Sequence, residues 1–231
     1  MLKHYLNSLV RSRTTVSFGD IERLDPVSRV FGLERGTPVD RFYIERFLME
    51  RSDLIRGEVL EIGSDLYTRR FGGNAVSHGH VLAAKGTHEH ERMIIGDLSD
   101  STSLPAEQMD CFICTQTLNF IYDVPKAVEG ALHLLKPGGT LLATVAGISQ
   151  VSRYDMDRWG DYWRFTTASL ERLFTPVFGD GVVITSHGNL PVTLAFLQGL
   201  SVEDLPDPTL LDVVDPDYQL LLTIIARKGR K

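Results

Sequence analysis

Four polar residues stand where short apolar runs end, at positions that could form a binding site. They are Glu61, Asp97, Thr115 and Gln116. Apolar runs of four to eight residues bounded by turn residues are typical of buried parallel strands. Open parallel sheets bind ligands at the carboxyl ends of their strands. We therefore expect these side chains to converge on one crevice, a pattern that suits an adenosine-containing cofactor.

A second group of reactive residues lies in the stretch Gly147–Thr166. It combines three acids with several tyrosines and both tryptophans of the chain; the acids are Asp155, Asp157 and Asp161. Aromatic rings pack on sugar faces, carboxylates bind hydroxyl groups, and a carboxylate or histidine can remove a hydroxyl proton. We expect these acids to be catalytic, with Mg²⁺ held by them and a solvated loop as open alternatives. His187 and Tyr43 are the next candidates.

The elements that would position these residues follow from hydrophobic spacing. Strands are predicted at 59–62, 75–84 (interrupted by His-Gly-His), 93–95, 111–115, 140–145, 182–186 and 220–226. Helices are predicted at 38–51, 123–135 and 167–174. The alternation predicts an α/β fold with a mostly parallel sheet. We divide the chain into an N-terminal cap, 1–57, and a main domain, 58–231.

The order of four motifs resembles the class I S-adenosylmethionine-dependent methyltransferases of the type-11-like group. The motifs are VLEIG (Val59–Gly63), IIGDL (Ile94–Leu98), DCFICTQTL (Asp110–Leu118) and LKPGG (Leu135–Gly139). The YWRFT segment, Tyr162–Thr166, is similar to segments of methyltransferases from polysaccharide and sugar pathways. The resemblance covers roughly residues 20–230. It implies a Rossmann-like fold with a seven-stranded sheet, an antiparallel last strand and an N-terminal helical cap.

The same resemblance implies an O-methyltransferase that acts on a hydroxyl group of a sugar, oligosaccharide or polysaccharide. Two alternatives stay open: methylation of another small molecule, and a catalytically silent protein that keeps the fold. S-adenosylmethionine is the implied cofactor. The residues expected to bind it are Glu61, Gly63, Ser64, Asp65, Tyr67, Asp97, Leu98, Thr115, Gln116 and Arg41.

The sequence departs from the family pattern at two places. Asp65 and Tyr67 replace two glycines of the turn after the first strand. The acid expected at the end of the second strand is absent, because Ala83, Ala84 and Lys85 stand there; Glu89 or Glu91 could substitute. Since a pyrophosphate would be repelled by Glu61 and Asp65, the turn still favours S-adenosylmethionine over NAD or FAD.

The composition of the chain limits which classes of partner it can bind. A net charge of −6 argues against nucleic acid, and no apolar run approaches the ~20 residues of a membrane span. We expect a cytoplasmic protein without a signal peptide, with Cys111 and Cys114 as buried thiols on opposite strand faces. The expected partner is a small-molecule or oligosaccharide acceptor, with a homodimer left open. Two His-x-His pairs, His78/His80 and His88/His90, lack the further ligands of a familiar zinc site.

Overall fold

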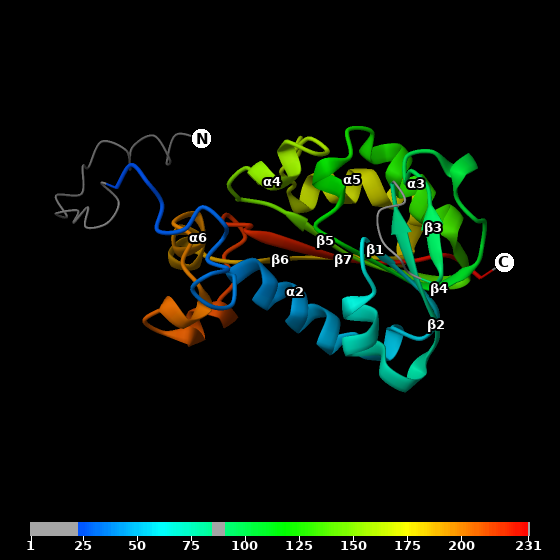
Figure 1. Cartoon of the computed structure of the whole chain (residues 1–231), viewed down its shortest axis with the longest axis horizontal. Coiled ribbons are helices and arrows are strands. Elements are labelled where there is room, and N and C mark those ends of the chain that lie inside the picture. The colour runs from blue at the N-terminus through cyan, green and yellow to red at the C-terminus, as the bar shows by residue number, and fades with distance from the viewer. Residues whose placement is uncertain (1–22, 85–90, 231) are drawn as a thin grey trace, which may run out of the picture.

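A seven-stranded sheet forms the centre of the molecule in the computed structural model, which describes residues 23–84 and 91–230 (Figure 1). The strand order is β3-β2-β1-β4-β5-β7-β6. The strands are β1 (Gly57–Ile62), β2 (Val76–Ala83), β3 (Met93–Ile95), β4 (Met109–Thr115), β5 (Leu135–Ala146), β6 (Val182–His187) and β7 (Leu221–Arg227). β1 to β5 pair in parallel, while β7 runs antiparallel between β5 and β6. This confirms the expected Rossmann-like sheet and its antiparallel last strand.

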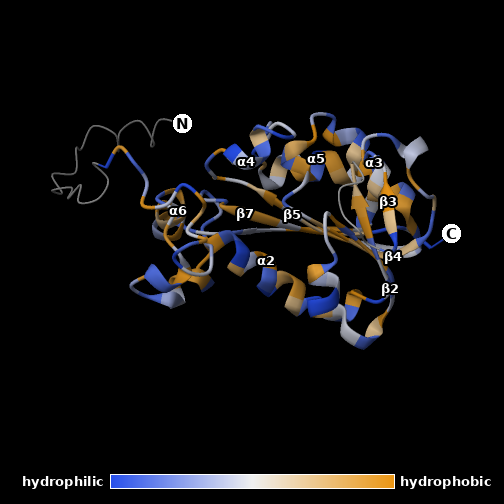
Figure 2. Ribbon diagram, in the orientation of Figure 1, coloured by the Kyte–Doolittle hydropathy of each residue, from blue (hydrophilic) through white to orange (hydrophobic). Residues whose placement is uncertain are grey.

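Helices cover both faces of the sheet. The helices are α2 (Val39–Glu50), α3 (Val124–Leu134), α4 (Arg153–Met156), α5 (Thr167–Phe178) and α6 (Leu190–Leu197). α3 and α5 share one apolar core with the sheet, and α2 and α6 share the other, so the molecule has three layers (Figure 1). The strands are mainly hydrophobic, while the helices carry polar residues as well (Figure 2). Short 3₁₀ turns occur at 52–54, 73–75, 101–103, 118–120, 179–181, 202–204 and 208–212, and a π turn at 68–72.

The two cysteines lie on opposite faces of β4, as expected. Cys111 belongs to the α2 side of the core and Cys114 to the α3 side. Both are free thiols, and burial raises the pKa of each to about 12. Neither thiol is therefore a nucleophile at neutral pH.

Several predicted boundaries are wrong for identifiable reasons. β2 passes through His78-Gly79-His80 without a break, because both imidazoles bind the Glu58 carboxylate on β1, at 2.7 and 2.8 Å. β5 begins at Leu135, before the Pro-Gly-Gly turn, because Leu135 pairs with Met109 across an irregular register. α5 extends four residues beyond its expected end at Phe174, to Phe178. α4 and α6 were not expected.

The helix α2 places the N-terminal part of the described chain against the sheet. Its buried face includes Tyr43 and Phe47, in the same core as the α6 residue Phe196. The Tyr43 hydroxyl donates to the Leu211 carbonyl at 3.1 Å, and its ring lies 5.2 Å from that of His187. These contacts orient the first turn of α2 toward the site described below. In the part of the chain that the structure describes, no helix has the length and apolarity to cross a membrane.

Candidate functional site: two adjoining cavities at the strand ends

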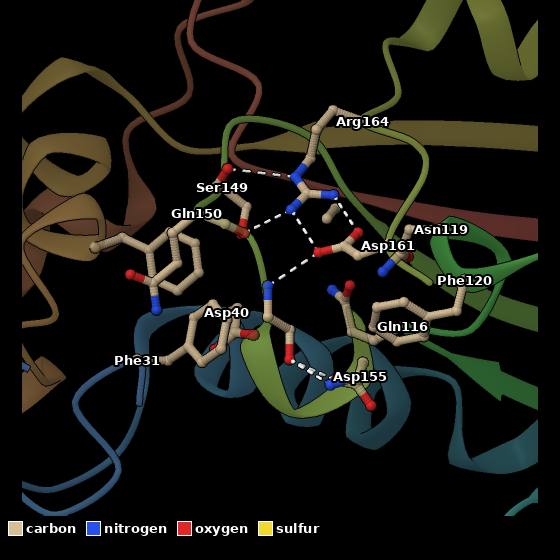
Figure 3. A pocket seen from close by; sticks show the side chains of 13 residues that line it. Phe31, Asp40, Gln116, Asn119, Phe120, Ser149, Gln150, Asp155, Asp161 and Arg164 are labelled. Atoms are coloured by element: carbon tan, nitrogen blue, oxygen red, sulfur yellow. Dashed lines mark hydrogen bonds and ion pairs between the residues drawn. The ribbon is translucent and has the colours of Figure 1, made fainter. Parts of the chain in front are cut away.

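Two cavities adjoin at the carboxyl ends of β1, β4 and β5. The larger, here called the outer cleft, has a volume of about 650 Å³ and lies over the ends of β1 to β4. The smaller, the inner pocket, has a volume of about 290 Å³ and is bordered by α2, α6 and the chain after β5 (Figure 3). Gln116, Phe120 and Asp155 line both cavities. These residues therefore stand where the two cavities meet, a place called the shared wall below.

Gly63 forms the end of the outer cleft at β1. Its φ is 72°, in the left-handed region that favours glycine, and its N–H donates to the Leu82 carbonyl at 2.9 Å. A Cβ atom built at this position would meet nothing within 4 Å. Gly63 thus leaves open space where a ligand can approach the backbone closely.

Glu61 shapes the turn that follows β1 and does not line the outer cleft. Its buried carboxylate accepts hydrogen bonds from the Tyr67 N–H at 3.1 Å and from the Thr68 N–H and hydroxyl at 2.7 and 2.8 Å. Burial raises the pKa of this carboxyl group, and the bonds from Thr68 and Tyr67 oppose that change. The acid therefore holds the turn in the conformation that presents Gly63.

Four further residues expected to bind the cofactor lie outside both cavities. Ser64 is exposed, and Asp65 pairs with Arg69 beside a separate cavity. The Tyr67 ring packs on Phe71, with centroids 5.9 Å apart. Arg41 is exposed on α2. For these four residues the side chains lie next to the turn or the helix, away from the outer cleft.

Asp97 and Leu98 line the outer cleft after β3, as expected. The Asp97 carboxylate accepts from the Ser99 N–H and hydroxyl, at 2.8 and 2.7 Å, and both bonds use Oδ1. Among the described contacts, Oδ2 stays available to a ligand. Leu98 is buried, and its carbonyl lies so close to Gly130 of α3 that a Cβ there would be 2.0 Å away. α3 thus fixes this loop against the sheet.

Thr115 and Gln116 end β4 at the junction of the cavities. Thr115 lines the outer cleft. Gln116 has a φ of 47°, which non-glycine residues adopt rarely, and its N–H donates to the Thr144 carbonyl at 2.8 Å. The strained backbone directs the Gln116 side chain into the shared wall (Figure 3). Backbone strain of this kind is typical of functional sites.

Among the described residues, none at the end of β2 brings an acid into the outer cleft. Ala83 and Ala84 line it there, and Glu91 lies beside the separate cavity near Arg69. Glu89, the other expected substitute, lies outside the described residues. Within the described residues, the carboxylates that line the outer cleft are those of Asp97, Asp123 and Asp155.

The three acids after β5 have different surroundings. Asp155 on α4 lines both cavities, and its carboxylate accepts a hydrogen bond from the Ser152 hydroxyl at 2.5 Å. Asp157 is exposed, pairs with Arg153 at 3.1 Å and lines neither cavity. The Asp161 side chain is only 1% exposed. Asp155 and Asp161 thus both line the inner pocket, whereas Asp157 lies outside it.

Asp161 holds together the chain that encloses the inner pocket. Its carboxylate binds Arg164 through two oxygens at 2.6 and 2.9 Å, and it accepts the Ser152 N–H at 2.9 Å. Arg164 also donates to the carbonyls of Ser149 and Gln150, at 3.3 and 2.6 Å (Figure 3). A bidentate pair of this kind is both strong and directional. Asp161 is thus a structural residue of the pocket wall.

Two residues of the inner pocket were missed by the sequence. Asp40, in the first turn of α2, lines it, and burial raises the pKa of its carboxyl group despite the Arg41 N–H bond and charge. Asn119, after β4, is 3% exposed, and its Oδ1 atom has no hydrogen-bond partner. No motif marked Asp40 as a site residue.

His187, the next catalytic candidate, lines neither cavity. His187 lies against Tyr43, bonds Thr223 Oγ1 at 3.2 Å, and burial lowers its pKa to about 4. Within residues 23–84 and 91–230 no three His, Cys, Asp or Glu side chains gather to hold a metal ion. His88 and His90 lie outside those ranges. The alternative of a Mg²⁺ site therefore gains no support from the described residues.

Comparison with known proteins places these cavities in a familiar fold. Residues 63–143 match the family model described as a methyltransferase domain. An S-adenosylmethionine-dependent methyltransferase from Archaeoglobus fulgidus is 11% identical, with a TM-score of 0.53 over 81% of this chain and 94% of that one. One from Mesorhizobium loti is 14% identical, with a TM-score of 0.54 over 85% of this chain and 100% of that one. The search of curated proteins gives no significant match.

The fold is thus that of the S-adenosylmethionine-dependent methyltransferases. Fold alone does not define the reaction. The [4+2]-cyclase SpnF is equally similar, at 16% identity and a TM-score of 0.54 over 85% of this chain and 84% of SpnF. The function of this chain has to be inferred from its own cavities.

Proposed function

We propose that this chain transfers a methyl group from S-adenosylmethionine in the outer cleft to a hydroxyl group of a small polar acceptor in the inner pocket. The observation that carries the proposal is the wall shared by the cavities at Gln116, Phe120 and Asp155. In-line transfer needs the reacting atoms about 3–3.5 Å apart. Ligands that meet at a shared wall can satisfy this requirement.

The outer cleft has the charge that this cofactor requires. Of the described residues that line it, none is lysine or arginine, and three are acids: Asp97, Asp123 and Asp155. S-adenosylmethionine carries a positive sulfur, from which its methyl group can be transferred to a nucleophile. A pyrophosphate would meet like charge and find no basic partner here. The lining therefore favours S-adenosylmethionine over a dinucleotide.

Asp155 is the acid best placed to assist the transfer, because it lines both cavities. As the acceptor oxygen bonds to the methyl carbon and the carbon–sulfur bond breaks, Asp155 would take the hydroxyl proton. Asp161 would hold the loop in place. A sugar or oligosaccharide is the narrower acceptor that we propose, on the resemblance of the YWRFT segment.

A labelled-methyl assay tests this function. The purified chain is incubated with S-adenosylmethionine and panels of free sugars, oligosaccharides, phenols and amines, and products are identified by mass spectrometry. Asp155→Asn should lower turnover by about 10²–10⁴-fold, the usual contribution of a general base, with little change in cofactor affinity. Asp157→Asn is the matched control, since Asp157 lines neither cavity. Equal turnover of both variants would exclude Asp155 as the base, and labelled phenols or amines alone would exclude the sugar.

The end of β2 favours a second candidate, a protein that keeps the fold without catalysing methyl transfer. Ala83 and Ala84 stand where an acid would hold the ribose hydroxyls. Each carboxylate–hydroxyl bond contributes about 1.5–3 kcal/mol, so its absence weakens cofactor binding. Calorimetric titration with S-adenosylmethionine and S-adenosylhomocysteine separates the candidates. Absence of binding by both would favour the silent protein.

A further inference from the structure

Two hydrogen-bond acceptors of the inner pocket have unsatisfied capacity in the protein. Asn119 Oδ1 is buried without a partner, although buried polar atoms are almost always paired. Leaving such an atom unpaired costs about 1–3 kcal/mol. Asn119 lines the pocket, and a turn of its amide group would bring Oδ1 to a donor on a bound ligand.

The Asp40 carboxyl group has a similar need. A carboxylate in the first turn of a helix is ordinarily exposed and favoured by the helix dipole. Asp40 is half-buried at the edge of the pocket, and burial raises the pKa of its carboxyl group. One oxygen accepts the Arg41 N–H at 2.8 Å, and among the described residues no ion pair involves Asp40. A ligand that displaces water from this carboxylate would have to supply a donor in its place.

The remaining lining decides which donors suit the pocket. Arg164 is its only basic residue among those described, and its guanidinium group already binds Asp161 and three carbonyls. A phosphate or carboxylate on the ligand would therefore find no free cation. Phe31 and Phe196 stack at a centroid distance of 5.8 Å and form an apolar wall on which a ring could lie. Asp40 and Asn119 come from different sides of the pocket (Figure 3).

An amine would also donate hydrogen bonds, but it fits methyl transfer poorly here. A carboxylate such as Asp40 or Asp155 favours the charged ammonium form. An ammonium group has no lone pair to attack a methyl carbon, and the positive sulfur would repel it. Hydroxyl groups donate without charge and keep their lone pairs.

We propose that Asp40 and Asn119 fix the acceptor by accepting O–H donors from two separate positions of a neutral, polyhydroxylated ring, such as an unphosphorylated sugar or a cyclitol. The inference rests on the proposed function and adds its specificity-determining residues. It makes α2, outside the predicted main domain, part of acceptor recognition. Asp155 would then act on a third hydroxyl, at the shared wall.

Saturation-transfer NMR tests the proposal with defined probes: glucose, galactose, xylose and myo-inositol, against glucose 6-phosphate and ethanolamine, with S-adenosylhomocysteine present. At least one neutral probe should bind the wild-type protein, and the two charged probes should not. Asp40→Asn and Asn119→Leu should each weaken that binding by about 10- to 100-fold. Glu50→Gln, at the exposed end of the same helix, is the matched control and should bind normally.

Two further measurements separate failure of this inference from failure of the proposed function. Asn119→Leu should melt no lower than wild type, because it removes an unpaired buried atom, whereas a structural Asn119 would melt lower. Calorimetry with S-adenosylmethionine should give wild-type affinity in every variant. Absence of neutral-probe binding, or unchanged binding in Asp40→Asn, would overturn the inference while the proposed function stands. Failure of S-adenosylmethionine to bind would overturn the proposed function. Binding of the neutral probes can then still be measured by NMR without the cofactor.

Discussion

Gly63→Val should remove cofactor binding without unfolding the protein. The added isopropyl group would project into space that is empty to 4 Å around a Cβ built there, so no neighbour has to move. The cost to the fold is the left-handed backbone at φ 72°, about 1–2 kcal/mol for a residue with a side chain. In a chain of this size that lowers the melting temperature by about 2–8 °C.

The effect on binding should be far larger than the effect on stability. The side chain would occupy the place where the backbone meets the cofactor at the end of β1, and we expect affinity to fall about 100-fold or more, which is about 2.7 kcal/mol or more. Isothermal calorimetry with S-adenosylmethionine and S-adenosylhomocysteine measures this loss. Thermal melting measures the strain.

Gly179→Val provides the matched control. Gly179 has a φ of 62°, also has nothing within 4 Å of a built Cβ, and lines neither cavity. It should lose a similar amount of stability and keep wild-type affinity. If Gly63→Val and Gly179→Val both bind the cofactor like the wild type, the cofactor does not lie against β1, and the assignment of the outer cleft is refuted.

Three further outcomes follow from the same geometry. Asp97→Ala should weaken S-adenosylmethionine binding by about 1.5–3 kcal/mol. Asp100→Ala removes the same kind of side-chain bond to a turn outside the cleft and should leave the cofactor affinity unchanged. If calorimetry gives the two variants equal affinities, Asp97 only caps its turn. Asp161→Asn should lower the free energy of unfolding by about 1–3 kcal/mol, because Arg164 loses its charged partner. An unchanged midpoint in denaturant unfolding would contradict the structural role of Asp161. The folded-state pKa of His187, about 4, lies below its unfolded value, so the wild type should lose up to about 3 kcal/mol between pH 6.5 and 4. Thermal melts of His187→Asn should show a smaller loss of stability over the same pH range. If the stability of the variant and of the wild type falls in parallel with pH, His187 is not the cause.

Most of the sheet could be predicted, because the local hydrophobic pattern of the sequence is enough to locate its strands. β1, β3 and β4 are short apolar runs, and the rule that parallel strands meet at one edge placed Gly63, Asp97 and Gln116 at a common cleft. β2 was harder to predict, since its His-Gly-His segment is polar. Its continuity depends on Glu58, which stands on another strand and binds both imidazoles.

The acid-rich loop shows where sequence reasoning ends. Asp155, Asp157 and Asp161 share a residue type and a short stretch of chain, so nothing in their spacing separates a pocket acid from a paired one. The partners decide: Arg164 engages Asp161 and Arg153 engages Asp157. Such pairing depends on how the backbone turns after β5, which includes the unexpected helix α4.

Asp40 could not be predicted for a different reason. It reaches the inner pocket only because α2 packs across the sheet next to α6, a contact between segments far apart in the chain. A helix pattern tells which face of α2 is apolar, but not which strand end its first turn will meet.

The left-handed backbone of Gln116 has a consequence for anyone who evolves this protein toward heat tolerance. A glycine at this position would relieve about 1 kcal/mol of strain. Libraries screened for thermal survival alone should therefore enrich glycine at residue 116, and the survivors would lose a side chain that lines both cavities. Residue 116 would then be a site where thermal selection and selection for activity favour different amino acids, so a screen that omits turnover would discard the function it sets out to preserve.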